Sequence, residues 1–467
     1  MAKLFGTDGM RGEAGRFPLD VETVCATGRS LTRHLAERLG RAPQIIVGRD
    51  TRESGAWIAS ALISGAQQAG ARCSSAGVMT TPGVAFLTQH LQADAGVVIS
   101  ASHNPFSDNG IKIFAPTGQK LDEQLERLIE EDIFAERAAS EVEDHSGEAR
   151  HSSFTAGPVE TTVRSIEDSN LVREMRELYL QHLASKADGL RLDGLKVVID
   201  CANGAASEIA PEIFARLGAR VAPIHNRPDG RNINRDCGSL HLDSLRRTVL
   251  EQGADVGVAF DGDADRALFI DERGETVDGD AVLWIMAQRM QERGELSANT
   301  VVATVMSNMG LEVALRERGI KLLRTPVGDK YVLDELIRTG ATLGGEQSGH
   351  IIFPRLSLAG DGLLTALQVF RAMREAAKGL SELAAGFVPF PQVLVNVRVR
   401  EKAPFDEVAA IKACADEIER ALDGQGRLLL RYSGTEPLAR IMIEGRDRPM
   451  IEALVSQLAS VIERELG

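Results

Sequence analysis

The sequence is poor in aromatic residues and in long hydrophobic runs. Only 4% of its 467 residues are Phe, Trp or Tyr, which argues against the stacked aromatic surfaces that bind single-stranded nucleic acid. The sequence has no apolar run of roughly 18 residues, as a membrane-spanning helix requires, and its opening segment MAKLFGTDGMRG lacks the apolar core of a secretion signal. The formal net charge of −14 disfavours a generic nucleic-acid or anionic-membrane surface. We therefore expect no nucleic-acid partner and no membrane association.

Cysteine is scarce and scattered. The five cysteines are Cys25, Cys73, Cys201, Cys237 and Cys414, and none belongs to a Cys-x-x-Cys pair. This usage predicts reduced thiols in a cytoplasmic protein, and neither a disulfide framework nor a zinc site.

One pattern occurs three times, at residues 44–73, 196–221 and 300–325. Each copy has a short β-branched strand, a polar turn, a helical stretch that ends near glycine, and a second strand or its start. Alternating strands and helices predict parallel α/β layers. After about residue 375 the pattern changes to the period-two strand VLVNVRVR and two amphipathic helices, which predicts a small α+β domain.

The expected fold class is therefore α/β, with three similar α/β domains that contain mixed sheets and a smaller C-terminal α+β domain. We expect the domains to span residues 1–155, 156–254, 255–374 and 375–467. A segment rich in charge, Ser and Gly at residues 136–158 is predicted to be an exposed connection.

The segment ISASHNPFSDNG at residues 99–110 ends a β-branched run with Ser100, Ser102 and His103. Taken alone, it is most simply interpreted as a surface turn. The alternative is a nucleophile held at a rigid strand end. SASHN lacks the Gly-x-Ser-x-Gly elbow of a serine hydrolase, and the chain has neither a nucleoside-triphosphate loop nor a kinase signature set. A serine that exchanges a phosphoryl group beside a divalent ion is the interpretation that remains.

Three aspartates alternate in the segment DVGVAFDGDADRALFIDE at residues 255–272, namely Asp261, Asp263 and Asp265. Carboxylates this close repel one another unless a cation neutralises them, so the spacing favours a hard divalent ion over an acidic turn. A helix-loop-helix calcium site is rejected because Arg266 occupies its glycine position and because strands are expected on both sides. Arg266 would lie beside the ion and could hold a phosphate oxygen.

Other polar loops are ambiguous on their own. RYSGTEPLAR at residues 431–440 is either a phosphate cradle or a hairpin turn with solvated arginines. GGEQSGH at residues 344–350 is either a sugar-binding loop or a plain loop. Three basic residues are either anion contacts or loop caps, namely Arg11, Arg49 and Arg52. His103 and Lys112 flank the loop that contains Ser102, and they indicate a function only together with their neighbours.

The four segments ISASHNP, DGDADR, GGEQSGH and RYSGTEP, in this order, resemble the motifs of the α-D-phosphohexomutases. The resemblance covers essentially the whole chain and implies four domains around a central cleft, each contributing one loop. Within the family, FGTDGMRG, DCANGA, VGDKYV and GEQSGH are most similar to the bacterial members that act on glucosamine phosphates. Lys330 in VGDKYV stands where arginine is more usual.

The resemblance also implies roles for individual residues. Ser102 would carry the phosphoryl group, and its phosphate oxygen would bind one Mg²⁺ together with Asp261, Asp263 and Asp265. The remaining catalytic residues would be Arg11, His103, Lys112, Arg266 and His350. The sugar would contact Glu346, Ser348 and Lys330, and its non-reacting phosphate would contact Arg431, Ser433, Gly434, Thr435 and Arg440.

The implied activity is an isomerase that interconverts glucosamine 6-phosphate and glucosamine 1-phosphate, on the route to UDP-N-acetylglucosamine. The reaction would pass through phosphoserine at Ser102 and a glucosamine 1,6-bisphosphate intermediate, and this or a similar sugar bisphosphate would act as activator. The expected partner is a small sugar phosphate, with a homodimer as a possible assembly. The alternatives are mannose or glucose phosphates as substrates, a sugar phosphatase, and a sugar-phosphate sensor without catalysis.

Overall fold

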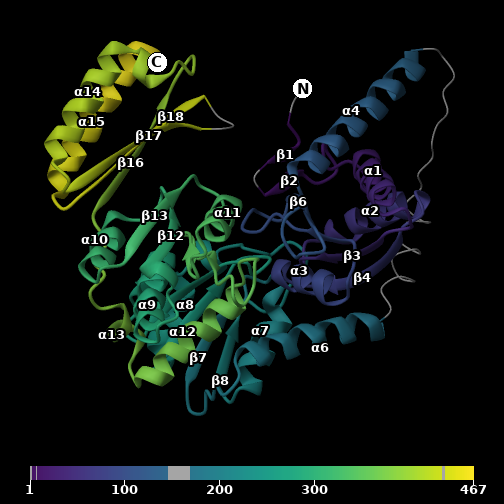
Figure 1. Cartoon of the computed structure of the whole chain (residues 1–467), viewed down its shortest axis with the longest axis horizontal. Coiled ribbons are helices and arrows are strands. Elements are labelled where there is room, and N and C mark those ends of the chain that lie inside the picture. Colours follow the sequence, from purple (N-terminus) through teal and green to yellow (C-terminus); the bar gives the residue numbers. More distant parts are fainter. Residues whose placement is uncertain (1–2, 7, 146–168, 434–436) are drawn as a thin grey trace. The chain divides into compact units, whose positions relative to one another are not determined.

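The computed structural model describes residues 3–6, 8–145, 169–433 and 437–467 (Figure 1). The chain forms two compact units. The large unit comprises Met1–Val305 and Leu323–Ala384, and the small unit comprises Met306–Leu322 and Ala385–Gly467.

The first sheet of the large unit has six strands. It carries the loop between Ile99 and Asp108 that contains Ser102, which we call the serine loop. Its strands, in spatial order, are β1 (Phe5–Gly6), β2 (Gly9–Glu13), β6 (Asp108–Phe114), β5 (Ala95–Ile99), β3 (Gln44–Arg49) and β4 (Arg72–Val78). Its helices are α1 (Val21–Leu39), α2 (Gly55–Gln68), α3 (Thr81–His90) and α4 (Glu123–His145). Strand β3 is parallel to β4 and β5, whereas β6 is antiparallel to β5 and β2.

Alternate residues of β3 explain why helices cover both faces of this sheet. Ile45 and Val47 pack into the hydrophobic cluster that contains Leu62 of α2. Gly48 points to the other face, where a Cβ atom would lie 2.4 Å from a methyl carbon of Val84 in α3. Since both faces are buried, most polar functional groups of this sheet are expected in the loops at the strand ends.

The second sheet has five strands. It carries the turn between Phe260 and Ala267 that contains the three aspartates, which we call the acidic loop. Its strands, in spatial order, are β11 (Thr276–Val277), β10 (Ala267–Asp271), β9 (Val256–Phe260), β7 (Lys196–Asp200) and β8 (Arg220–Ile224). The helices in this part of the chain are α6 (Ser169–Lys186), α7 (Ala206–Arg216) and α8 (Asp243–Gln252). Strand β7 is parallel to β8 and β9, and β10 is antiparallel to β9. The expected boundary between residues 254 and 255 therefore falls inside this sheet, just before β9.

The third sheet has four strands. Their spatial order is β13 (Lys321–Thr325), β12 (Thr300–Thr304), β14 (Gly344–Gly345) and β15 (Ile351–Ile352). Strand β12 is parallel to β14, which is antiparallel to β15. The helices of the large unit that follow the second sheet in sequence are α9 (Gly279–Glu292), α11 (Asp329–Thr339), α12 (Gly362–Ala376) and α13 (Leu380–Ala384).

The small unit contains a three-stranded antiparallel sheet in the order β16 (Gln392–Arg398), β18 (Leu438–Gly445) and β17 (Gly426–Tyr432). Its helices are α10 (Met309–Glu317), α14 (Ala409–Leu422) and α15 (Arg448–Leu466). Short 3-10 helices in the chain are η1 (Gly238–Leu240), η2 (Ser297–Asn299) and η3 (Phe405–Glu407). In β16, Val397 is buried while Leu394 and Arg398 are exposed, so the predicted one-sided strand is confirmed.

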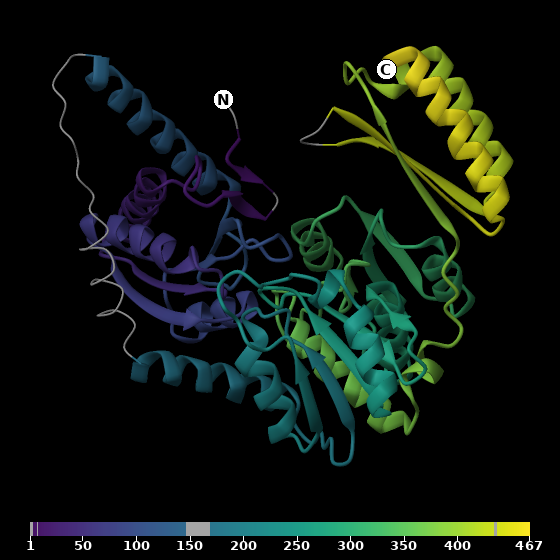
Figure 2. The same ribbon diagram turned by 180° about the vertical axis from the view of Figure 1, so that it is seen from behind.

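The predicted fold class is confirmed, and the three repeated patterns form β3–α2–β4, β7–α7–β8 and β12–α10–β13. The prediction of an exposed connection at residues 136–158 is wrong for residues 136–145, which continue helix α4 (Figure 2). That stretch is rich in Glu and Ala, which favour helix despite its polarity. The expected domain boundary between residues 155 and 156 lies outside the described residues, and the four domain ranges stay predictions.

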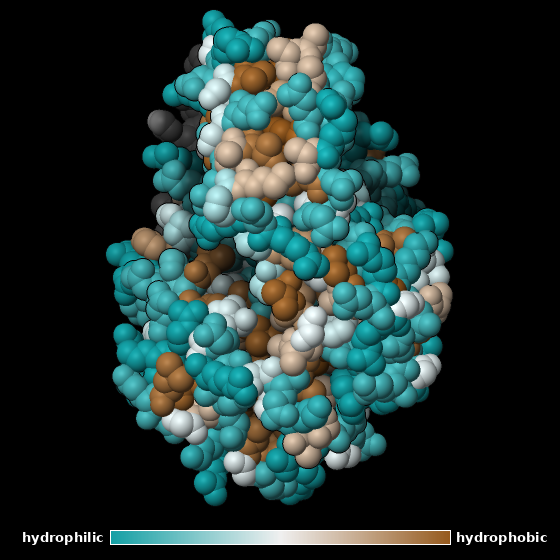
Figure 3. Space-filling view, turned by 90° about the vertical axis from the view of Figure 1, so that its left-hand side faces the viewer, coloured by the Kyte–Doolittle hydropathy of each residue, from teal (hydrophilic) through white to brown (hydrophobic). Residues whose placement is uncertain are grey.

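The surface has no membrane-spanning feature among the helices that the structure describes, because none is long and apolar enough to cross a bilayer. On the face drawn in Figure 3, hydrophilic residues cover most of the surface and hydrophobic residues are scattered in small groups.

Candidate active site

Ser102 follows strand β5 and faces the acidic loop of the second sheet. Its backbone has a left-handed φ of 52°, and the residue is only 1% exposed. Its Oγ donates a hydrogen bond of 2.5 Å to Asp261 Oδ2 and lies 3.2 Å from His103 Nδ1. The strand end is thus not a surface turn, because the hydroxyl is buried and aimed at a carboxylate 159 positions further along the chain.

A buried ion pair stabilises the serine loop through hydrogen bonds. Asp50 and Arg52 are both fully buried and paired with each other. Arg52 Nη2 donates to the carbonyl oxygens of Ser102 at 3.2 Å and Asn104 at 2.6 Å. Asp50 accepts the hydroxyl of Ser100 at 2.6 Å, and that hydroxyl in turn accepts the backbone N–H of Ser102 at 2.9 Å. Of the two functions considered for Arg52, the structure favours a loop cap.

A second support for the loop comes from the second sheet. The side-chain amide of Asn234 donates to the carbonyl oxygens of Ser102 at 2.8 Å and Asn104 at 3.0 Å. Sequence reasoning missed Asp50 and Asn234 because their hydrogen-bond partners are 50 and 132 positions away. The only local signal was the polar run GRDTR at the end of β3, which contains Asp50.

The three aspartates lie in the turn between the antiparallel strands β9 and β10. Asp261 and Asp263 are fully buried and Asp265 is 6% exposed. One carboxylate oxygen of each lies within 4.8 Å of the other two. Burial, together with repulsion from Asp265 and Asp263, holds the pKa of Asp261 well above its usual value. This repulsion is what a bound divalent cation would relieve.

The donor set fits a hard cation such as Mg²⁺. In the part of the chain that the structure describes, Asp263 Oδ1 and Asp265 Oδ1 are buried without a hydrogen-bond partner. The second oxygen of Asp263 accepts the hydroxyl of Thr81 at 2.5 Å and Lys112 Nζ at 2.8 Å. Carboxylate oxygens with free lone pairs, fixed by outer hydrogen bonds, are the ligands that Mg²⁺ prefers.

Lys112 supplies positive charge to the acidic loop from the first sheet. Its Nζ is 2.8 Å from Asp263 Oδ2, 3.4 Å from Asp265 Oδ2 and 3.1 Å from Asp8 Oδ2. Burial alone would lower the pKa of Lys112, but the charges of Asp263, Asp8 and Asp265 raise it well above its usual value. Lys112 is therefore a cation at neutral pH, and it offsets one of the clustered negative charges.

Two histidines near the site differ in their protonation state at neutral pH. Burial, aided by the charges of Arg266 and Arg11, lowers the pKa of His103 to about 4. Burial opposes protonation of His350 too, but the hydrogen bond and charge of Asp265 outweigh it and raise the pKa to about 9. At neutral pH, His103 is neutral and His350 is a cation.

The two arginines of the expected catalytic group line the same region. Arg266 donates its backbone N–H to Asp261 Oδ1 at 3.2 Å, and its Nε is 3.9 Å from Asp265 Oδ1. Arg11 pairs with Asp8. Within the described residues, the buried Nε atoms of both arginines have no hydrogen-bond partner, so each retains a donor for an anionic ligand.

The expected sugar-binding loops lie beside His350 within the large unit. Glu346 is nearly buried, and its Oε1 accepts the backbone N–H of Gly328 at 3.0 Å. Its own N–H donates to the carbonyl oxygen of His350 at 2.9 Å, while Ser348 is half-buried. Lys330 Nζ pairs with Glu123 Oε1 at 2.6 Å. This basic residue therefore contacts helix α4, which follows the first sheet in sequence.

The expected phosphate cradle belongs to the small unit. Arg431 of β17 and Arg440 of β18 are directly paired across the antiparallel strands, and Arg440 Nη2 donates to Ser433 Oγ at 3.4 Å. Burial and the neighbouring charge of Arg440 lower the pKa of Arg431, an arrangement that an anion would stabilise. Gly434 and Thr435 lie outside the described residues.

Family models match nearly the whole chain. They are described as phosphoglucomutase/phosphomannomutase α/β/α domains I, II and III and C-terminal domain, at residues 2–140, 177–274, 278–390 and 394–461. The chain belongs to this family, the α-D-phosphohexomutases. Its relatives include the phosphoglucosamine mutase of Solibacter usitatus, which is 49% identical over 100% of both chains. The phosphoglucosamine mutase of Geobacter sp. is 45% identical over 100% of this chain and 99% of the relative.

Solved structures of other phosphohexomutases share the fold. A phosphoglucomutase/phosphomannomutase family protein from Burkholderia thailandensis has a TM-score of 0.76 at 22% identity and covers 99% of this chain and 97% of its own. The N-acetylphosphoglucosamine mutase of Aspergillus fumigatus, solved in complex with GlcNAc-6P and magnesium, has a TM-score of 0.64 at 18% identity. That match covers 99% of this chain and 95% of the fungal one.

Proposed function

We propose that this protein is a mutase that interconverts glucosamine 6-phosphate and glucosamine 1-phosphate. The observation that carries the proposal is the hydrogen bond from Ser102 Oγ to Asp261, inside a buried cluster of three carboxylates. A phosphoryl group on Ser102 would lie against the cation that such a cluster binds. The choice of glucosamine rests on relatives named phosphoglucosamine mutase, which are 45–49% identical over essentially the full length.

One Mg²⁺ would be held by Asp261, Asp263 and Asp265 together with an oxygen of phosphorylated Ser102. The support is the pair of buried carboxylate oxygens, Asp263 Oδ1 and Asp265 Oδ1, that have no hydrogen-bond partner among the described residues. When bound, the ion offsets the negative charge of the phosphoryl group during transfer.

In the first half-reaction, the 1-hydroxyl of glucosamine 6-phosphate attacks the phosphorus on Ser102. The bond from phosphorus to Ser102 Oγ breaks and a bond to the sugar oxygen forms, while the attacking hydroxyl gives up its proton to a base and Ser102 Oγ takes up a proton to become a hydroxyl. The resulting glucosamine 1,6-bisphosphate turns around in the site. Ser102 then takes the 6-phosphoryl group, which releases glucosamine 1-phosphate and restores phosphoserine. The same bisphosphate, or a similar one, would load Ser102 initially.

The charged residues around Ser102 divide into two roles. His103 is neutral at neutral pH and lies 3.2 Å from Ser102 Oγ, so it would hydrogen-bond to the reacting serine oxygen without adding charge. Lys112, Arg11, Arg266 and His350 are cations and would stabilise the charge of the phosphoryl group.

Substrate recognition would be shared between two sets of residues. Glu346 and Ser348 would accept and donate hydrogen bonds at sugar hydroxyls, with Lys330 at the start of helix α11. The phosphate that does not react would bind the cradle formed by Arg431, Ser433, Gly434, Thr435 and Arg440. Paired guanidinium groups are typical of such phosphate sites.

A substrate comparison tests this function. Turnover is measured with glucosamine, mannose and glucose 6-phosphates at equal Mg²⁺, and free phosphate is measured in the same samples. We expect kcat/KM to be at least about tenfold higher for glucosamine 6-phosphate, with negligible free phosphate. Equal or better turnover of mannose 6-phosphate would show that the substrate is a different hexose phosphate used by the same family. Phosphate release that matches substrate loss would make the protein a phosphatase.

We also propose a cytoplasmic homodimer. The location is supported by five cysteines that are unpaired in the part of the chain that the structure describes. Light scattering on the purified protein tests the assembly, and a monomer at micromolar concentration would exclude it.

A further inference from the structure

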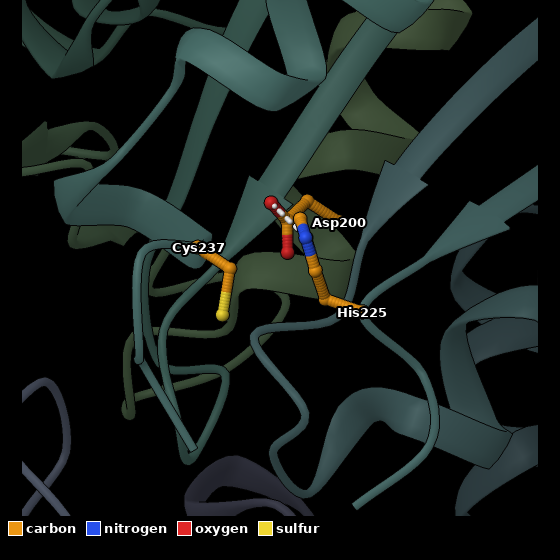
Figure 4. A group of neighbouring side chains, drawn as sticks. All are labelled: Asp200, His225 and Cys237. Carbon is orange, nitrogen blue, oxygen red and sulfur yellow. Dashed lines mark hydrogen bonds and ion pairs between the residues drawn. The ribbon is translucent and has the colours of Figure 1, made fainter. Parts of the chain in front are cut away.

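A carboxylate, an imidazole and a thiol lie together at one end of the second sheet, outside the candidate active site. Asp200 is the last residue of β7, His225 directly follows β8, and Cys237 directly precedes η1. Because β7 and β8 are parallel and Asp200 is paired with Ile224, Asp200 and His225 reach the same sheet edge. The loop that returns from β8 places Cys237 beside them (Figure 4).

The distances within this group suit a small metal ion. His225 Nδ1 is 2.9 Å from Asp200 Oδ2, and one ligand atom of each residue lies within 4.8 Å of the other two. Around a tetrahedral zinc ion, whose ligand bonds are about 2.0–2.3 Å long, ligand atoms are about 3.3–3.8 Å apart. The separation of 2.9 Å between His225 and Asp200 is shorter than that range, and the limit of 4.8 Å for the whole group is compatible with it.

Burial and access are also compatible with an ion. Asp200 and Cys237 are fully buried, whereas the side chain of His225 is 30% exposed and forms the solvent side of the group. Burial, together with the charge of Asp200, raises the pKa of Cys237 to about 12. Without a cation the thiol keeps its proton, and a bound cation would take the place of that proton.

The backbone around the group is held in an unfavourable conformation. Five residues with a Cβ atom have left-handed φ values between 46° and 57°, namely Ala202, Asn203, His225, Asn234 and Asp236. The side chain of Asn203 stabilises this arrangement, since its Oδ1 accepts the N–H of Arg227 at 3.1 Å and its Nδ2 donates to the Asn232 carbonyl at 3.3 Å. Backbone held in sparsely populated regions concentrates at ligand and functional sites.

We propose that Asp200, His225 and Cys237 form a binding site for a divalent cation of the zinc class, with water as the fourth ligand. Thiolate and imidazole ligands select zinc-like ions, whereas the oxygen-only set of Asp261, Asp263 and Asp265 selects Mg²⁺. The two sites therefore bind different ions and do not compete at physiological Mg²⁺.

The ion would stabilise the segment between His225 and Cys237, which supports the serine loop. The segment between His225 and Cys237 contains Asn234, whose amide holds the carbonyl oxygens of Ser102 and Asn104. A cation bound at both ends of this segment fixes the position from which Asn234 reaches Ser102. The residues are far apart in sequence and include no Cys-x-x-Cys pair, which is why the sequence predicts no zinc site.

Cobalt absorption tests the site. Reduced protein is freed of transition metals, kept in saturating Mg²⁺ and titrated with Co²⁺ as a substitute for zinc. Bound Co²⁺ gives a near-ultraviolet sulfur-to-cobalt absorption band only when a thiolate is one of its ligands. We expect this band to saturate at one cobalt per chain. Cys237→Ser should abolish the band and His225→Ala should weaken cobalt binding at least tenfold. The matched control Cys73→Ser, at a half-buried thiol outside the group, should keep it.

Two results would overturn the proposal. One is a folded wild-type protein that gives no sulfur-to-cobalt band, and the other is a band that survives Cys237→Ser. If Cys237→Ser does not fold, His225→Ala decides instead, because its partly exposed side chain can be removed with less disturbance. An unchanged cobalt affinity in that variant contradicts the site. The band does not depend on Ser102, so this outcome is separate from the mutase assay.

Discussion

At the residue scale, the candidate active site is built from groups that are unfavourable alone. Asp261, Asp263 and Asp265 are buried next to one another, and Lys112 offsets only part of their charge. Since like charges in a poorly solvated site repel strongly, the protein without a cation is less stable than its packing would allow. We therefore expect the same clustered charges to give the site affinity for Mg²⁺ and to lower the stability of the protein without the ion.

Replacing one of these carboxylates should separate the two effects. In Asp261→Asn, the amide oxygen still accepts the Ser102 hydroxyl, but one buried negative charge is gone. We expect the Tm in EDTA to equal or exceed that of the wild type. In the wild type, Mg²⁺ at 100 times its Kd should stabilise by about 2.7 kcal/mol, and in the variant this increment should be largely lost.

Thermal unfolding with and without Mg²⁺ measures both quantities. The matched control is Asp243→Asn, because that side chain is 96% exposed and contacts no part of the site. A full Mg²⁺-dependent rise in Tm for Asp261→Asn would show that the aspartates do not hold the cation.

At the element scale, strand ends bring the site together. The end of strand β5 delivers Ser102 and the β9–β10 turn delivers the aspartates, whereas Lys112 lies within β6. Strands β5 and β9 carried a local signal, namely an apolar, β-branched run that stops at polar residues, and these two elements were predictable from the sequence. What holds them in register was not, because Asp50, Arg52 and Asn234 act on partners 50–132 positions away. The helical state of residues 136–145 in α4 was not predictable from their polarity, because charged residues are common both in exposed helices and in loops.

The loop that carries Asn234 should affect the rate more than binding. In Asn234→Ala, the carbonyl oxygens of Ser102 and Asn104 lose one donor each but keep Arg52. We expect kcat to fall about 10–100-fold through misplacement of Ser102, with KM changed less than about threefold. Steady-state kinetics give both values. A rise in KM at unchanged kcat would assign Asn234 to substrate binding instead.

The N-terminus of α12 should make stability depend on pH. Asp361 caps this helix by accepting the N–H groups of Leu363 and Leu364, and its other oxygen accepts the Tyr179 hydroxyl at 2.8 Å. Burial raises the pKa of Asp361 to about 6. A folded-state pKa above the unfolded value of 3.8 means that the protonated acid stabilises the fold at low pH and that this contribution is lost as pH rises through 6.

Asp361→Asn should remove this dependence. Asparagine keeps the helix cap through its amide oxygen, and its amide NH2 can donate to the Tyr179 oxygen in place of the lost acceptor, but it does not ionise. Between pH 4 and pH 7, the wild type should lose up to about 3 kcal/mol relative to the variant, seen as a Tm difference that widens with pH. A Tm difference that stays constant over this interval would contradict a raised pKa at Asp361.

At the scale of the whole molecule, the two units contribute different chemistry. The large unit contains the serine, the aspartates and the residues expected to contact the sugar, whereas the small unit contains the paired arginines Arg431 and Arg440. A reaction that holds the substrate alternately by either phosphate needs a phosphate site separate from the reacting groups. We expect the C-terminal domain, matched at residues 394–461, to provide that phosphate site.

Arg440→Ala should therefore weaken substrate binding without unfolding the chain. Loss of a charge-assisted hydrogen bond costs roughly 1.5–3 kcal/mol, so we expect KM to rise about 10–100-fold while Tm changes little. The matched control is Arg398→Ala on the neighbouring strand β16, where the side chain is exposed. Equal KM values for the two variants would remove Arg440 from the phosphate site.

The most direct test of the central claim is the intact mass of the protein after incubation with glucosamine 1,6-bisphosphate and Mg²⁺. The account predicts that the wild type and the exposed-loop control Ser107→Ala gain one phosphate. It predicts that subsequent glucosamine 6-phosphate removes this group, and that Ser102→Ala never acquires it and loses nearly all mutase turnover. A Ser102→Ala protein that gains phosphate like the wild type, or that turns over substrate normally, would contradict the account.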